Sequence, residues 1–275
     1  MTISIGLIPN NEAVMLIQDS EVTYPGVGFT QDIYRKIQEI DKHAVVGVTG
    51  RPILANEILE LIKGEQYKSS RELSDKVEQA YHQVRNKHLQ RGFLAKYGFS
   101  DIRDVIAPPQ GVQINPKVVD EILHIANNAN NFFTLDLMLA TNYESPLIYI
   151  TEFPGSTALF SNLKDYAVSG SGGIMALEKM GAELENYRWQ KELSIDEGID
   201  ILMKAGKASE KHVGVGGPFE IVYIEKQKDG TKVIRPDQKK INMVMYLFPL
   251  EIKEDIMKEA ISKMRDKDGE FSKGF

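Results

Sequence analysis

The order of the short apolar segments is the feature that most limits the fold of this chain. Segments with strand-like alternation open it, two amphipathic segments with helical spacing follow, and strands, paired helices and strands then come again. Runs of strands separated by pairs of helices are typical of an α+β protein in which helices cover two antiparallel sheets. We therefore expect one large α+β domain over residues 1–235 rather than two small ones.

The first twenty residues predict a hairpin whose first strand begins at the second residue. Residues 2–8 and 13–17 form the expected strands around a turn at 9–12. A small residue after Met1 allows the initiator to be removed, and the chain then begins with Thr2, which carries both a hydroxyl and a free α-amine. An α-amine titrates at roughly 7.7 to 8.0, so it can accept the hydroxyl proton near neutral pH. Thr2 is therefore the candidate nucleophile, and an ordinary edge strand is the other interpretation.

The later segments predict further helices and strands by their periodicity and turn residues. A helix striped by Ile174, Leu177, Met180 and Leu184 is followed by one that Ser194 caps, with Glu197 three residues on as a capping box. The other expected elements are strands at 33–40 and 44–49, helices from 52 to 62 and from 70 to about 96, and strands at 133–139, 147–151, 219–224 and 231–234.

Two segments lie outside this repeating order. Residues 92–131 contain a break at Pro108-Pro109-Gln110-Gly111 and an amphipathic stretch that begins at Asn115-Pro116, so they predict an inserted helical segment. It could cover a substrate entrance, block a contact between subunits, or pack as an extra helix. Residues 236–275 are expected to form a C-terminal extension with a helix over Ile252 to Ile261.

Composition excludes several classes of function. The chain has no cysteine, which excludes disulfides, thiolate metal sites and thiol nucleophiles. A net charge of −6 without a basic run argues against a nucleic-acid surface. The longest apolar runs fall short of the roughly 18 residues that a membrane span needs, and the N-terminus lacks the features of a signal peptide, so we expect a cytoplasmic protein. The histidines lack ligand spacing, and we expect no metal or organic cofactor.

A series of short motifs in one order resembles a proteasome β subunit over most of residues 2–225. The motifs are Gly6, Asp19-Ser20-Glu21-Val22-Thr23, Lys36-Ile37-Gln38-Glu39-Ile40-Asp41, Val45-Val46-Gly47-Val48-Thr49-Gly50, Ser169-Gly170-Ser171-Gly172-Gly173 and a helix at 194–200. The chain is similar to prokaryotic proteasome-like N-terminal-nucleophile hydrolases with a mid-chain insertion. This resemblance implies a four-layer αββα sandwich, threonine-type hydrolysis of an amide or peptide bond, a homo-oligomeric ring and an ATP-dependent unfoldase as partner.

The resemblance also implies roles for individual residues. Lys36 matches the lysine beside the nucleophile, and Asp19 matches the acid that keeps this lysine charged. Gly50 matches the glycine whose amide stabilises a tetrahedral oxyanion. Ser171 matches the serine that hydrogen-bonds the α-amine. From the residues alone, these four could equally be a solvent-facing lysine, a turn aspartate, a strand-ending glycine and part of a helix-entry turn.

Substrate recognition is implied less directly. Val22, Tyr34 and Val48 match positions near the first specificity pocket of the family, which would make that pocket apolar and of medium size. The turn Gly170-Ser171-Gly172 could instead hold a phosphate at a helix N-terminus. It lacks the length and the lysine of a P-loop, so nucleotide binding is disfavoured.

One segment departs from the family pattern. Where the family has Asp-x-x-Ser-Gly-Gly, this chain places His212 at the acid and Val215 at the serine. Glu210 could supply a carboxylate from the preceding helical turn, or His212 could bond Ser171. The departure leaves two functions open. One is a hydrolase that forms an acyl-enzyme at Thr2, and the other is a non-catalytic ring or binding subunit.

Overall fold

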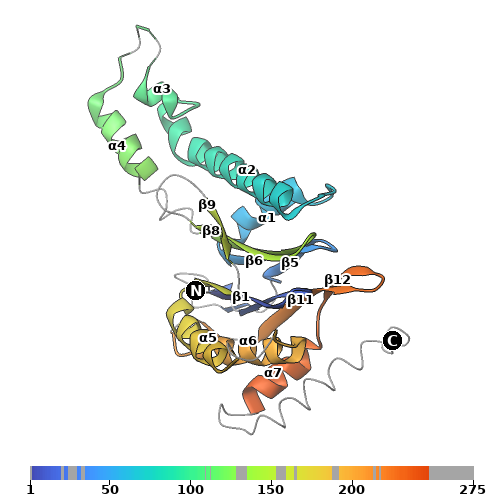
Figure 1. Cartoon of the computed structure of the whole chain (residues 1–275). Helices are drawn as coiled ribbons and strands as arrows, with labels where there is room; N and C mark the ends of the chain where they lie inside the picture. The colour runs from blue at the N-terminus through green and yellow to red at the C-terminus, as the bar shows by residue number, and fades with distance from the viewer. Residues whose placement is uncertain are drawn as a thin grey trace.

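Two five-stranded antiparallel sheets form the centre of the protein, which is α+β as the order of segments predicts (Figure 1). The structure is a computed structural model. It describes residues 2–19, 22–23, 30–31, 35–108, 110–111, 113–127, 135–152, 159–163, 166–187, 192–212, 215–216 and 218–247.

The first sheet is built around the N-terminal hairpin and has the order β10-β1-β2-β11-β12. Its strands are β1 (Ile3–Asn10), β2 (Ala13–Asp19), β10 (Tyr166–Gly170), β11 (Phe219–Gln227) and β12 (Gly230–Ile234). The hairpin is confirmed, with its turn shortened to residues 11–12. β10 was not predicted, because its small residues give a weak strand signal. It nevertheless pairs with β1 so that Ile3 lies opposite Gly170.

The second sheet has the order β5-β6-β7-β8-β9. Its strands are β5 (Ile37–Asp41), β6 (Ala44–Gly50), β7 (Leu135–Asn142), β8 (Pro146–Glu152) and β9 (Leu159–Leu163). β5 is shorter than predicted, with residues 33–34 outside the described ranges, and the segment that forms β9 was not predicted. β3 (Val22–Thr23) pairs with β4 (Thr30–Gln31) separately.

Three apolar cores hold the sheets and helices together. One lies between the sheets and includes Leu16, Val45 and Met138. The second joins β1, β2 and β11 to α5 (Gly173–Tyr187) and α6 (Ile195–Ser209), and the third joins β6 and β7 to α1 (Pro52–Ile62) and α2 (Ser70–Leu89). In Figure 1, α1 and α2 lie above the sheets and α5 and α6 below them.

The two helices of the lower layer test the predicted patterns. The capping box is confirmed, because the Glu197 amide donates to Ser194 Oγ at 3.2 Å and the Ser194 amide donates to Glu197 Oε2 at 2.8 Å. The predicted stripe of α5 is only partly buried. Met180 is fully buried, whereas Ile174 and Leu177 are 73% and 49% exposed.

The insertion is helical, as predicted, and projects away from the sheets (Figure 1). α2 ends at Leu89 and not near residue 96, but the chain continues to wind through a π turn at Gln90–Leu94 and a 3-10 turn at Ala95–Tyr97. α3 (Arg103–Ile106) and α4 (Pro116–Asn127) follow. A small core of its own, formed by Leu94, Val105 and Ile122, holds this segment together.

The predicted C-terminal extension begins with a helix that packs on the main body. In α7 (Gln238–Leu247), Ile241 is buried in the core beneath the first sheet. Asn242 exchanges hydrogen bonds with the backbone of Phe219 on β11. The helix expected over residues 252–261 lies outside the described ranges. Within those ranges, no helix has both the length and the apolarity needed to cross a bilayer.

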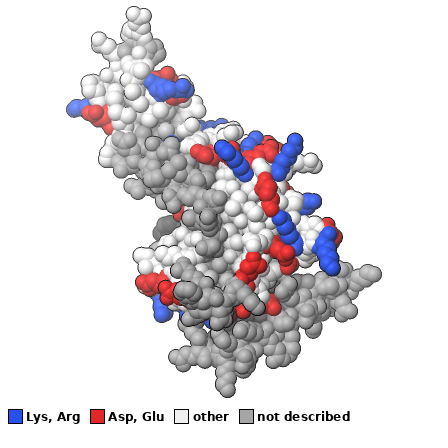
Figure 2. Space-filling view, viewed as in Figure 1, with Lys and Arg blue, Asp and Glu red and all other residues white. Residues whose placement is uncertain are grey.

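Charged side chains of both signs lie next to each other on the surface. On the described part of the face shown in Figure 2, neither the acidic nor the basic residues gather into a patch. Exposed ion pairs between residues close in sequence contribute to this pattern, for example Lys232 with Asp229 at 2.7 Å. Such exposed pairs add little to stability.

Candidate active site

Thr2, Lys36 and Asp19 meet at one end of the two sheets. Lys36 Nζ donates hydrogen bonds to Thr2 Oγ1 at 3.0 Å and to Asp19 Oδ1 at 3.2 Å. The three residues are 8%, 4% and 0% exposed, respectively. The structure thus brings a hydroxyl, an ammonium and a carboxylate together in a buried place, where charge interactions are stronger than in water.

Strand pairing places these side chains. Asp19 is the last residue of β2 and faces the start of β1, where the Ile3 amide donates to Asp19 Oδ1 at 3.0 Å. Lys36 immediately precedes β5 and is held to the neighbouring strand, because the Val48 amide donates to the Lys36 carbonyl at 3.0 Å. The hairpin of the first sheet therefore supplies Thr2 and Asp19, and the second sheet supplies Lys36.

Burial has a large effect on the Asp19 carboxyl. It raises the pKa of Asp19 from 3.8 to about 6, even though Lys36 and the Ile3 amide act in the opposite direction. Both hydrogen bonds go to one oxygen, and among the described residues Asp19 Oδ2 has no hydrogen-bond partner. At neutral pH Asp19 is therefore mainly ionised and paired with Lys36, whereas it binds a proton in mildly acidic solution.

The turn after β10 holds the main chain of Thr2. The Ser171 amide donates to the Thr2 carbonyl at 3.0 Å. Gly170 has φ of 103°, and a Cβ added there would lie 2.0 Å from the Thr2 carbonyl oxygen, so a side chain does not fit. The side chain of Ser171 is exposed. Its predicted bond to the α-amine remains a prediction.

Gly50 lies on the other sheet. It is the exposed last residue of β6, pairs with Leu135 of β7, and has φ of 103°, which favours glycine. α1 begins two residues later at Pro52. Gly50 and Thr2 therefore belong to different sheets, and how the sheets pack decides how the two residues face each other.

The predicted specificity residues are only partly placed. Val48 is 2% exposed and packs in the core with α1 and α2. The buried side chain of Gln18 bonds both backbone groups of Val48: it donates to the carbonyl and accepts from the amide. Sequence reasoning missed Gln18, although an amide in an otherwise apolar strand is a signal. The Val22 side chain and Tyr34 lie outside the described residues.

The segment that departs from the family pattern packs behind the Ser171 turn. Val215 is buried, and a Cβ added at Gly172 would lie 3.1 Å from Val215 Cγ2. Val215 thus belongs to the apolar core that joins the first sheet to α5 and α6. The Glu210 carboxylate lies 2.5 Å from Lys207 Nζ on its own helix. The suggested substitution of the family's acid by Glu210 or His212 remains a prediction.

A second pair of polar side chains connects the two sheets at this end. Ser169 Oγ on β10 donates to Asp136 Oδ2 on β7 at 3.0 Å. Burial raises the pKa of Asp136, and the bond from Ser169 lowers it by a smaller amount. Sequence reasoning did not single out this pair. Asp136 is the single charged residue of β7, which was the available signal.

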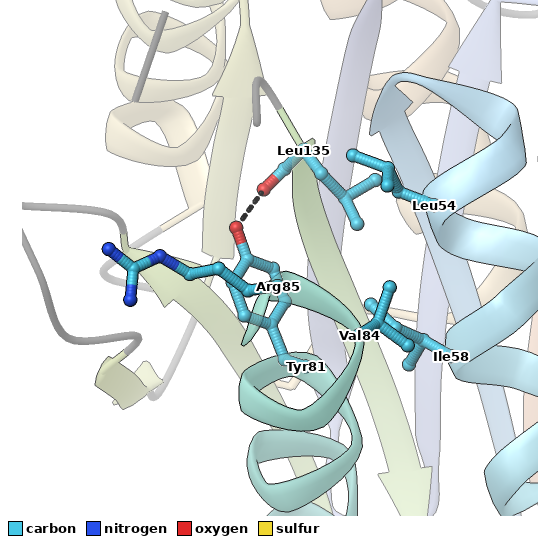
Figure 3. A pocket seen from close by; sticks show the side chains of 6 residues that line it. All are labelled: Leu54, Ile58, Tyr81, Val84, Arg85 and Leu135. Atoms are coloured by element: carbon cyan, nitrogen blue, oxygen red, sulfur yellow. Dashed lines mark hydrogen bonds between the residues drawn. The ribbon is translucent and has the colours of Figure 1, made fainter. Parts of the chain in front are cut away.

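A small pocket lies on the helix side of the second sheet. Its walls are mostly apolar, and the Tyr81 hydroxyl donates to the Leu135 carbonyl at 3.2 Å (Figure 3). The Arg85 guanidinium points away from the apolar side chains. Over the described ranges, no group of three acidic or histidine side chains is placed to hold a metal ion. The lining residues are Leu54, Ile58, Tyr81, Val84, Arg85 and Leu135.

Comparison with known proteins adds no assignment to this geometry. Neither the protein-family models nor the curated proteins contain a match to the chain. The functional interpretation therefore depends on the contacts around Thr2 and on the motifs that resemble a proteasome β subunit.

Proposed function

We propose that the protein is a threonine-type amide or peptide bond hydrolase of the proteasome-like N-terminal-nucleophile class, with Thr2 as nucleophile after removal of Met1. The observation that carries the proposal is the 3.0 Å contact between Lys36 Nζ and Thr2 Oγ1 beside Asp19. Two stacked antiparallel sheets with helices on both outer faces are compatible with the four-layer αββα sandwich of that class.

In the proposed reaction, the free α-amine of Thr2 accepts the proton of Oγ1 as Oγ1 attacks the carbonyl carbon of the substrate amide. The Lys36 ammonium stabilises the negative charge on Oγ1, and Asp19 keeps Lys36 charged. The Gly50 amide stabilises the tetrahedral oxyanion. The C–N bond then breaks, the leaving amine takes the proton from the α-ammonium, and water hydrolyses the ester on Thr2.

The cost of the Lys36–Asp19 pair supports a functional role for it. Taking two charges out of water is expensive, and apolar residues of similar volume often serve stability as well or better. Both side chains are almost fully buried, and burial raises the pKa of Asp19 to about 6. A pair of this kind in contact with a threonine hydroxyl is therefore better explained by chemistry than by stability.

The test is covalent labelling with a β-lactone, which acylates nucleophilic hydroxyl groups. The native protein and Thr2→Ser should each form one ester adduct that peptide mapping places at residue 2. Thr2→Ala should form none. Thr141→Ala is the matched control. This buried threonine lies near the end of β7 and donates to Ser70 Oγ at 2.9 Å. An adduct that survives Thr2→Ala, or a folded native protein that does not react, contradicts the proposal.

One observation favours the second candidate, a non-catalytic ring or binding subunit. Val215 is buried in the apolar core beneath the first sheet, at the position where the family resemblance implies a serine. Such a subunit would not react with the lactone, whether or not Met1 is removed.

Assembly and location are further parts of the proposal. The resemblance supports a homo-oligomeric cytoplasmic ring for either function, and an ATP-dependent unfoldase partner for the hydrolase. Native mass spectrometry of the full chain tests the ring, and a monomeric mass at micromolar concentration would contradict it.

A further inference from the structure

The distance between the proposed nucleophile and the proposed oxyanion site depends on how the two sheets are held together. Thr2 leads into β1 of the first sheet, whereas Gly50 ends β6 of the second sheet. Strands of the two sheets do not pair with each other. Side chains that connect the sheets at this end must therefore set the separation between Thr2 and Gly50.

Several polar side chains connect the two sheets there. Lys36 approaches from the second sheet and contacts Thr2 and Asp19 of the first. Gln18 on β2 bonds both backbone groups of Val48 on β6. Ser169 Oγ on β10 donates to Asp136 Oδ2 on β7 at 3.0 Å. Lys36 already belongs to the proposed chemistry, whereas the Ser169–Asp136 bond has no role in it.

Both ends of the Ser169–Asp136 bond are adjacent to groups that position the proposed site. Ser169 is followed by Gly170, where an added Cβ would lie 2.0 Å from the Thr2 carbonyl oxygen. Next comes Ser171, whose amide donates to that carbonyl. Asp136 follows Leu135, the residue that pairs with Gly50. One hydrogen bond thus links the backbone that holds Thr2 to the backbone that holds Gly50.

Burying the Asp136 carboxyl group on β7 costs free energy. β7 is otherwise apolar or neutral, and burial raises the pKa of Asp136. None of the ion pairs among the described residues includes Asp136, so no cation offsets the cost of its burial. A carboxylate accepts a stronger hydrogen bond than a neutral group, which favours the link to Ser169.

We infer that Asp136 and Ser169 are positioning residues that clamp the two sheets together and keep Thr2 at working distance from the Gly50 amide. The inference rests on the proposed function, because it assumes that Thr2 attacks and that Gly50 receives the oxyanion. A displacement of about 1 Å between reacting groups can slow a reaction by about 100-fold, so one well-placed hydrogen bond can have a large effect.

The kinetic test measures lactone acylation of four variants over a range of lactone concentrations. Ser169→Ala and Asp136→Ala should lower the maximal acylation rate by about 10-fold to 100-fold, with the half-saturating concentration changed less than about twofold. Ser169→Thr keeps a hydroxyl donor, and Asp136→Asn keeps a carbonyl acceptor. These two conservative variants should therefore recover most of the rate.

Asn142→Ala is the matched control. Asn142 also connects the sheets, because its Nδ2 donates to the Glu12 carbonyl at 2.8 Å, but it does so at the opposite end of β7. Its loss should lower stability and leave the maximal acylation rate unchanged. If Asn142→Ala slows acylation as much as Ser169→Ala, or if the conservative variants are as slow as the alanine variants, the clamp is refuted.

Hydrogen exchange tests the clamp without relying on activity. Ser169→Ala and Asp136→Ala should increase deuterium uptake in peptides that contain Gly170 and Ser171, and Asn142→Ala should not. If the native protein fails to react with the lactone, the proposed hydrolase fails and exchange alone decides the clamp. Unchanged uptake at residues 170–171 in both alanine variants would overturn it.

Discussion

The two ends of the sheets use polar residues in different ways. At the end away from Thr2, where the turns at 11–12 and 42–43 lie, polar side chains mostly bond to backbone groups. Asn10 Nδ2 donates to the Leu193 carbonyl at 3.0 Å, and Asn142 Nδ2 donates to the Glu12 carbonyl at 2.8 Å. Both bonds go to backbone carbonyls, of which the Glu12 carbonyl also accepts from the Lys226 amide, and each bond stabilises the fold modestly.

At the Thr2 end, buried polar side chains also bond to each other, in addition to the backbone bonds of Asp19 and Gln18. Lys36 bonds Thr2 and Asp19, and Ser169 bonds Asp136. Burial raises the pKa of both aspartates, so these groups are held in places that disfavour their charge. Bonds at the far end therefore serve stability, whereas burial of charged groups at the Thr2 end costs stability, as the proposed function would require.

Replacement of Lys36 should have the largest effect. Lys36→Met leaves Asp19 buried without a cation, which should destabilise the protein by about 3–5 kcal/mol at pH 8. Lactone acylation of Thr2 should fall at least about 100-fold. Urea unfolding and labelling rates measure the two effects. Adding Asp19→Asn to Lys36→Met should restore much of the stability and none of the reactivity. If the double variant regained labelling as well as stability, the Lys36–Asp19 pair would serve stability alone, like the polar bonds at the far end.

Gly170 should be nearly as sensitive. An added methyl group would lie 2.0 Å from the Thr2 carbonyl oxygen, at a φ of 103°. Gly170→Ala should therefore cost about 2–4 kcal/mol of unfolding free energy and displace Thr2. Gly230→Ala is the control, because Gly230 has φ of 121° but open space around it. It should cost about 1 kcal/mol and leave lactone labelling intact. Equal costs at both glycines would show that backbone conformation, and not contact with Thr2, explains the need for glycine.

Asp19 should make stability and reactivity respond to pH in opposite directions. Because its folded pKa of about 6 lies above its ordinary value of 3.8, the folded state holds the extra proton between these values. Its contribution to stability is therefore fully present below about pH 4 and is lost as the pH rises to 6. The change should be on the order of 1–3 kcal/mol in the difference between the native protein and Asp19→Asn.

Acylation of Thr2 should instead rise with pH, with one step near 6 as Asp19 ionises and pairs with Lys36 and a second near roughly 7.7 to 8.0 as the α-amine loses its proton. Urea unfolding and labelling rates between pH 4 and 9 measure the two profiles in the native protein and in Asp19→Asn. A step near pH 6 that persists in Asp19→Asn would separate Asp19 from the chemistry.

The smallest effect is expected at the far end. The Tyr143 hydroxyl donates to Asp41, and the Tyr143 ring stacks on His43 with centroids 4.8 Å apart. Tyr143→Phe removes the hydrogen bond and keeps the ring, so it should cost about 1 kcal/mol in thermal or urea unfolding. Lactone labelling should not change. A loss of labelling would mean that the far end also sets the geometry around Thr2.

Much of the fold was predictable because its signals are local. The N-terminal hairpin, the capping box at Ser194 and the inserted helix at residues 116–127 each follow from periodicity or from a single turn residue. β9 and β10 were missed, since strands of five residues are too short to give a clear periodic signal. The exposed Ile174 and Leu177 show that helical spacing alone does not decide which turns of a helix are covered.

The candidate site was predictable only through the resemblance of motifs. No local pattern links Lys36 to Asp19 and Thr2, which are 17 and 34 residues away. Strand pairing brings Thr2 and Asp19 together, and packing of the two sheets brings Lys36 to them. The Ser169–Asp136 bond could not be predicted from the sequence, because its partners are 33 residues apart and lie on different sheets. Contacts between sheets depend on three-dimensional packing, which the sequence does not encode as a short motif.

The most direct test of the central claim is the intact mass of the natively expressed full chain, before and after exposure to the β-lactone. The account predicts a chain that has lost Met1, begins at Thr2 and gains the mass of one lactone, with no gain in Thr2→Ala. A chain that retains Met1 and gains no lactone would contradict the account, because the α-amine needed to accept the Thr2 proton would then be part of a peptide bond.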